Sequence, residues 1–106
     1  MERKTLMANY RQSEKEFRQQ VLDLALHLGY KTYFTWGSFH SPKGYPDLTL
    51  VRETRLIFIE LKSERGKLSL EQEEWLEALR ATRKCEVYSW YPQQWEEICK
   101  ILGGER

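Results

Sequence analysis

The sequence predicts a small α/β domain in which a mixed β-sheet is flanked by helices, in the order αβββαβα. Two observations carry this prediction. Apolar residues recur at helical spacing in two segments, and short runs rich in β-branched and aromatic residues lie after each of them. A chain of 106 residues has the size of one domain and buries about 60–65% of its unfolded surface. We therefore expect an N-terminal extension over residues 1–12 and a single domain over 13–106.

The first half of the domain is predicted to be one helix and three strands. Residues 13–28 form the helix, because an apolar stripe follows its 3.6-residue period and Gly29 stands at its end. Residues 31–36 alternate weakly and suit a first strand, and a loop rich in Ser, Pro and Gly follows. DLTLV (47–51) and LIFIEL (56–61) read as two further strands, and the short polar link between them favours a hairpin.

The second half is predicted to be a helix, a strand and a helix. Ser69 is placed to cap a helix that ends near Thr82 and buries apolar residues such as Leu76 and Leu79. Residues 86–90 form the fourth strand. Pro92 then opens a last helix over residues 93–102, because proline is favoured at the first position of a helix.

Three charged residues in or next to the two central strands predict a functional site: Asp47, Glu60 and Lys62. Side chains alternate along a strand, so Glu60 and Lys62 face the same way at the end of an apolar run. Asp47 opens the preceding strand, and the hairpin brings it toward Glu60. Two carboxylates beside a lysine predict a site for a hard divalent cation. The structural alternative is a buried ion-pair cluster, which is costly and seldom better than apolar packing.

These motifs resemble the catalytic core of the PD-(D/E)xK nucleases, with Pro46-Asp47 as the PD and Glu60-Leu61-Lys62 as the ExK. The surrounding residues are similar to those of the virus-type replication-repair nuclease family, the VRR-NUC domain, from about Glu16 to Trp90. They are Lys43-Gly44-Tyr45-Pro46-Asp47, Glu60-Leu61-Lys62-Ser63, Ser69-Leu70-Glu71-Gln72 and Trp75. The resemblance implies a restriction-endonuclease-like core and a Mg²⁺- or Mn²⁺-dependent phosphodiesterase in which Asp47, Glu60 and Lys62 are catalytic.

The resemblance also implies further site residues. The backbone carbonyl of Leu61 is expected to join Asp47 and Glu60 as a metal ligand. A glutamate of the first helix serves the same site, and Glu16 fits that position with Glu14 as its competitor. Gln72 is expected to border the catalytic residues. Glu16 and Gln72 each also complete a capping box, with Ser13 and Ser69, so a structural role stays open for both.

The resemblance further implies a substrate and an assembly. Small members of the family suggest a homodimeric endonuclease that acts on branched DNA such as four-way junctions. We expect an aromatic or C-terminal helix contact in the dimer, since Trp95, Ile98, Ile101 and Leu102 form an apolar stripe. Ser41, Lys43, Arg65 and Lys67 are the expected DNA contacts. Two alternatives remain: a non-catalytic nucleic-acid-binding or recruitment module, and a nuclease for single strands or RNA.

Composition limits the other classes of function. The net charge is +1, so no global basic field attracts nucleic acid, and the positive residues instead gather near the motifs. Cys85 and Cys99 are too isolated to form a zinc knuckle, and reduced thiols are expected. No apolar run reaches the length of a membrane helix and no signal peptide is visible, so we expect no membrane partner. The expected location is the cytoplasm of a bacterium or of a phage-infected cell.

Overall fold

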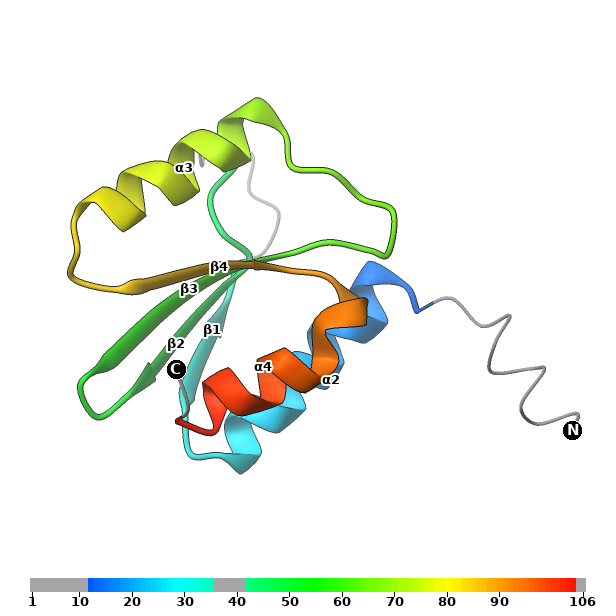
Figure 1. Cartoon of the computed structure of the whole chain (residues 1–106), viewed down its shortest axis with the longest axis vertical. Helices are drawn as coiled ribbons and strands as arrows, with labels where there is room; N and C mark the ends of the chain where they lie inside the picture. The colour runs from blue at the N-terminus through cyan, green and yellow to red at the C-terminus, as the bar shows by residue number, and fades with distance from the viewer. Residues whose placement is uncertain (1–11, 36–41, 105–106) are drawn as a thin grey trace, which may run out of the picture.

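The computed structural model describes residues 12–35 and 42–104 and has the predicted order of elements (Figure 1). The elements are α2 (Glu14–His27), β1 (Lys31–Phe34), β2 (Leu48–Arg52), β3 (Arg55–Leu61), α3 (Leu70–Ala81), β4 (Glu86–Trp90), η1 (Pro92–Gln94) and α4 (Trp95–Leu102). The α/β fold with helices on both faces of a mixed sheet is thus confirmed. The element ends agree with the prediction within about two residues. The last helix differs in kind at its start, where the 3₁₀ turn η1 precedes α4 and the Pro92 carbonyl accepts from Trp95 N–H.

The sheet has four strands in the order β1-β2-β3-β4. β1, β2 and β3 pair antiparallel, whereas β4 runs parallel to β3. In the ladder between β2 and β3, Leu48 lies opposite Ile59. Continuing this register by one residue places Asp47 opposite Glu60, on the same face of the sheet, because side chains alternate along both strands.

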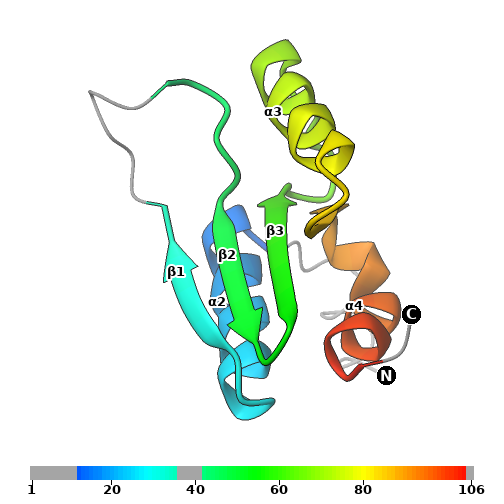
Figure 2. The same ribbon diagram turned by 90° about the vertical axis from the view of Figure 1, so that its left-hand side faces the viewer.

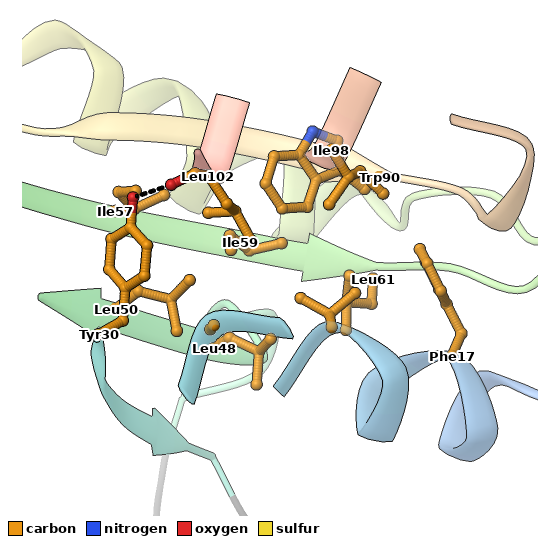
Figure 3. Close-up of a cluster of buried hydrophobic side chains, with 12 residues drawn as sticks. Phe17, Tyr30, Leu48, Leu50, Ile57, Ile59, Leu61, Trp90, Ile98 and Leu102 are labelled. Carbon is orange, nitrogen blue, oxygen red and sulfur yellow. Dashed lines mark hydrogen bonds between the residues drawn. The ribbon is translucent and has the colours of Figure 1, made fainter. Parts of the chain in front are cut away.

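The hydrophobic core lies between one face of the sheet and the helices α2 and α4 (Figure 3). Fully buried side chains from both helices and from β2, β3 and β4 meet there: Phe17, Val21, Ala25, Leu48, Leu50, Ile57, Ile59, Leu61, Trp90, Ile98 and Leu102. The Tyr30 hydroxyl donates to the Leu102 carbonyl at 2.8 Å and ties the end of α4 to this core.

The apolar stripe of α4 is used inside the chain. Ile98 and Leu102 are fully buried, and Trp95 and Ile101 pack against the same core. The expectation that this stripe is left over for a dimer contact is therefore wrong. The domain covers it because both α2 and α4 lie on the same face of the sheet (Figure 1).

The other face of the sheet is only partly covered. α3 lies over it on the side of β3 and β4, whereas no described helix crosses β1 and β2 there (Figure 2). Tyr33 on β1 is 62% exposed and Val51 on β2 is 39% exposed as a result. This half-open face is the one that carries Asp47 and Glu60. Within the described residues, no helix is long and apolar enough to span a membrane.

Candidate active site

Asp47 is held at the end of β2 by its neighbours on both sides. Its backbone carbonyl accepts from Thr35 N–H at 2.8 Å, and the Thr35 hydroxyl donates to the Pro46 carbonyl at 3.0 Å. The carboxylate oxygen Oδ2 accepts from the Leu61 backbone N–H at 2.9 Å. Because Leu61 directly follows Glu60, this bond fixes the Asp47 carboxylate beside the end of β3.

Glu60 is an almost completely buried carboxyl group. It is 1% exposed, and its oxygen Oε2 accepts from the Gln72 side-chain amide at 2.9 Å. The Lys62 ammonium lies 3.8 Å from the same oxygen. The second oxygen, Oε1, is buried and has no hydrogen-bond partner among the described residues. A buried polar atom without a partner is costly, so Oε1 marks a position where a proton or a cation belongs.

This environment raises the pKa of Glu60 to about 8. Burial is the largest cause, because removal from water disfavours the charged form. The negative charge of Asp47 adds to it, and so does the closeness of the Asp47 carboxyl group, with which a protonated Glu60 can share a hydrogen bond. The Lys62 charge acts in the opposite direction and Glu14 adds a weaker repulsion. Without a proton or a cation between them, the two neighbouring carboxyl groups repel each other when both are charged.

Gln72 makes two sets of hydrogen bonds, one with the N-cap residue Ser69 and one with Glu60. Its amide oxygen accepts from Ser69 N–H at 2.8 Å, and the Ser69 hydroxyl accepts from Gln72 N–H at 3.1 Å, which completes the capping box of α3. With the oxygen engaged at the cap, the NH₂ end of the amide faces Glu60 Oε2. The capping box therefore sets which end of the amide meets the carboxylate.

Glu16 and Glu14 are both exposed residues at the start of α2. The Glu16 carboxylate accepts from Ser13 N–H at 2.9 Å and closes the capping box of α2. Glu14, in contrast, raises the pKa of Glu60 through its charge. The structure gathers no set of three or more His, Cys, Asp or Glu side chains able to hold an ion within residues 12–35 and 42–104. Among the described residues, the resolved link between this helix and the pair is the charge of Glu14 acting on Glu60.

Three of the four expected DNA contacts lie within the described residues. Lys43, Arg65 and Lys67 are exposed on the loops before β2 and after β3. Ser41 lies outside the described residues. The side chain of Leu61 is in the core, and only its backbone faces Asp47.

Gly44 has a role that the sequence did not reveal. Its φ angle is +92°, and a Cβ atom there would lie 2.5 Å from the carbonyl carbon of Glu71 and 2.8 Å from Gln72 N. No side chain fits in that space, so the loop that leads to Asp47 docks directly on the first turn of α3. The glycine before the Pro-Asp pair was visible in the sequence, but its partner 27 positions later was not.

A divalent cation suits this donor set. The two facing carboxyl groups can carry more negative charge than the single Lys62 ammonium offsets, and one buried oxygen has no donor among the described residues. Mg²⁺ is commonly held by one or two carboxylates together with waters and substrate phosphates, so a two-carboxylate site is sufficient for it. Asp47 and Glu60 are the residues that would hold the ion.

Comparison with protein-family models matches residues 3–91 to the VRR-NUC domain. No curated protein and no solved structure is significantly similar to the chain. The match covers most of the 106 residues and includes β2, β3 and α3, which carry the residues described above. VRR-NUC nucleases are phosphodiesterases, and nucleases of this type are generally metal-dependent. The chain belongs to the VRR-NUC family.

Proposed function

We propose that the protein is a Mg²⁺- or Mn²⁺-dependent endonuclease that hydrolyses phosphodiester bonds in branched DNA, such as four-way junctions. One observation carries the chemical part of this proposal. Glu60 is 1% exposed, faces Asp47 and has a buried oxygen without a donor among the described residues. The pair is costly as a structural device, because the buried Glu60 carboxyl group and the half-buried Asp47 carboxyl group repel each other. A divalent cation bound between them removes that cost.

Each site residue has a distinct task in the proposed reaction. Asp47 and Glu60 hold the ion, together with the carbonyl of Leu61. When bound, such an ion acts as a Lewis acid on phosphoryl oxygens and lowers the pKa of water. Lys62, whose ammonium lies 3.8 Å from Glu60, would orient the attacking water and neutralise charge on the phosphoryl group. To deprotonate that water instead, Lys62 must first lose its own proton. Gln72 keeps the Glu60 carboxylate in place through its amide.

The helix glutamate is proposed to act from outside the pair. Glu16 fits the family position, whereas the charge of Glu14 reaches Glu60 and the Glu16 carboxylate closes the cap of α2. We propose that Glu16 assists the metal site, with Glu14 as its competitor. A comparison of Glu14→Gln with Glu16→Gln distinguishes them: the substitution of the assisting residue should weaken divalent-ion binding, and the other should not.

DNA is proposed to reach the site over the loops that precede β2 and follow β3. Lys43 stands before β2, and Arg65 and Lys67 stand after β3, so exposed positive charge flanks the carboxylate pair on two loops. Such contacts to phosphates make binding fall with salt concentration. Contacts to phosphates position the DNA strand but do not read its bases. They therefore fit an enzyme that selects its substrate by DNA structure rather than by sequence.

The experiment that tests this function is cleavage of labelled linear, splayed, flapped and four-way DNAs, and of the matching RNAs, with Mg²⁺ or Mn²⁺. We expect four-way or other branched DNA to be cut fastest. Lys62→Ala should lower the cleavage rate by about 10²–10⁴-fold while leaving DNA binding intact. Exclusive cleavage of RNA or single strands would favour that alternative substrate. DNA binding without cleavage of any substrate would favour a recruitment module.

A further inference from the structure

A shallow cavity of about 280 Å³ lies beside the candidate active site, between the loop before β2 and one side of α3. It is lined by Lys43, Glu71, Glu74, Trp75 and Ala78. The four residues from α3 are spaced i, i+3, i+4 and i+7, so they form one continuous stripe along the helix. The volume is near the lower end of ligand pockets and suits a single small ring system.

The cavity is joined to the active site through two aromatic residues. Trp75 follows Gln72 by three residues, which places it about 4.5 Å further along α3 than the amide that binds Glu60. Tyr45 precedes Asp47 by two residues and meets Trp75 edge-to-face, with ring centroids 4.9 Å apart. Tyr45 in turn contacts Phe58 on β3 in the same edge-to-face manner. Tyr45, Phe58 and Trp75 therefore form an aromatic cluster between the loop before β2, β3 and α3, and Trp75 of this cluster lines the cavity.

The polar residues of the cavity indicate the kind of ligand. Glu71 and Glu74 repel a phosphate, so a polyanionic backbone is not favoured inside it. Their carboxylates accept hydrogen bonds from the exocyclic amino groups that cytosine, adenine and guanine present. Lys43, at the edge of the cavity and four residues before Asp47, supplies one positive charge for the phosphate that joins such a base to the scissile bond.

We propose that this cavity binds one unpaired nucleobase next to the scissile phosphate, stacked against Trp75. The inference rests on the proposed nuclease function and adds a substrate requirement to it. Bases in a closed duplex are stacked on their neighbours and cannot enter, whereas strands at a branch point expose a base at low cost. Stacking on an aromatic side chain tolerates any base, so the contact selects DNA structure and not sequence.

The test combines one substitution with one substrate change. Ala78→Leu fills the cavity from an exposed helix position, and Ala81→Leu makes the same change at an exposed position that does not line it. Single-turnover cleavage is measured on branched DNA with one abasic nucleotide placed in turn on each side of the cleavage point. For the wild type, we expect a loss of at least about fivefold at one of these positions.

The expected pattern is non-additive. Ala78→Leu should slow cleavage of intact DNA by a similar factor and show no further loss with the abasic substrate, because both changes remove the same contact. Ala81→Leu should behave as the wild type. Equal rates for Ala78→Leu and wild type on intact DNA, or losses that multiply, would overturn the base pocket while leaving the nuclease function in place.

A binding measurement tests the base pocket independently of the nuclease function. Branched DNA with 2-aminopurine placed in turn at each nucleotide next to the branch point is bound to Lys62→Ala in Mg²⁺, and the probe's fluorescence reports stacking. A fluorescence change that disappears when Ala78→Leu is added supports the pocket even if no variant cuts DNA. A change that is the same with and without Ala78→Leu refutes it.

Discussion

At the scale of single residues, the main feature is a carboxyl group whose surroundings oppose its charge. Glu60 has Asp47 as a neighbour, one oxygen bonded to Gln72 and one oxygen without a donor among the described residues. Burial and the Asp47 charge raise its pKa to about 8. The site is therefore strained in the absence of a cation, and this strain can be measured as a dependence of stability on pH.

Stability of the metal-free protein should decrease as pH rises from about 4.5 to about 8. The folded state raises the pKa of Glu60 above its unfolded value, so the folded chain binds the extra proton in this range and the stabilising contribution is lost as that proton leaves. Glu60→Gln should flatten this dependence and raise the melting temperature at pH 8. Thermal unfolding in a chelator across pH measures it, with the exposed Glu73→Gln as a control that should retain the wild-type slope.

Gln72 offers a second prediction at this scale, because its two contacts can be separated. Gln72→Glu preserves the capping box but places an acceptor against Glu60, whereas Ser69→Ala removes the cap and keeps the amide. We expect Gln72→Glu to slow cleavage by about tenfold or more with little loss of helix stability. Ser69→Ala should cost about 1 kcal/mol of folding free energy and affect cleavage less. The reverse order of effects on cleavage would show that the cap alone matters.

At the scale of elements, the carboxylate pair depends on the contact between the loop before β2 and the first turn of α3. Gly44 makes this contact with its backbone, and Gln72 lies at the point where it is made. The contact therefore couples the position of Asp47 to that of Gln72.

Gly44→Ala should destabilise the fold by about 1–3 kcal/mol more than Gly29→Ala. Both glycines have positive φ angles, +92° and +89°, so the backbone strain of the new side chain is matched. Only at Gly44 does the added Cβ meet helix backbone, at 2.5 Å, since at Gly29 the nearest atom is 3.9 Å away in the Arg52 side chain. Denaturant unfolding and single-turnover cleavage measure the difference. Equal losses for the two variants would show that the loop does not hold α3.

The elements themselves were largely predictable from the sequence. Strands such as LIFIEL and helices with both a capping box and an apolar stripe contain their signals locally, and their ends agree within about two residues. The start of α4 was misplaced because proline marks the beginning of a turn but does not decide between a 3₁₀ and an α turn. The pairing of Asp47 with Glu60 followed from the hairpin. Contacts of Gly44 and Trp75 with distant segments could not be predicted, because they depend on how α3 packs on the sheet.

At the scale of the whole molecule, the fold leaves one face of the sheet partly open and fills the other with α2 and α4. The exposed apolar residues Tyr33 and Val51 lie on the open face. They replace the α4 stripe as the place where two copies would meet in the proposed homodimer.

Light scattering at micromolar concentration should give the mass of two chains. Tyr33→Ser should shift the mass toward one chain and reduce the preference for four-way junctions over linear duplex, since a two-fold dimer presents two sites to equivalent strands. Leu26→Ser is the control, because Leu26 is 58% exposed on α2, away from the open face. A single-chain mass for the wild type with equal cleavage of junction and duplex would remove the dimer proposal and leave the chemistry.

Asp47 and Glu60 are proposed to hold a divalent cation together, and calorimetric titration with Mn²⁺ measures that binding. At pH 7 the wild type should bind the ion and release protons, because ligands must be deprotonated and the pKa of Glu60 is raised to about 8. Asp47→Asn and Glu60→Gln should each weaken binding by at least about tenfold, the loss seen even for supporting residues of metal sites, while Glu73→Gln binds as the wild type does. Unchanged Mn²⁺ affinity in both Asp47→Asn and Glu60→Gln would contradict the account.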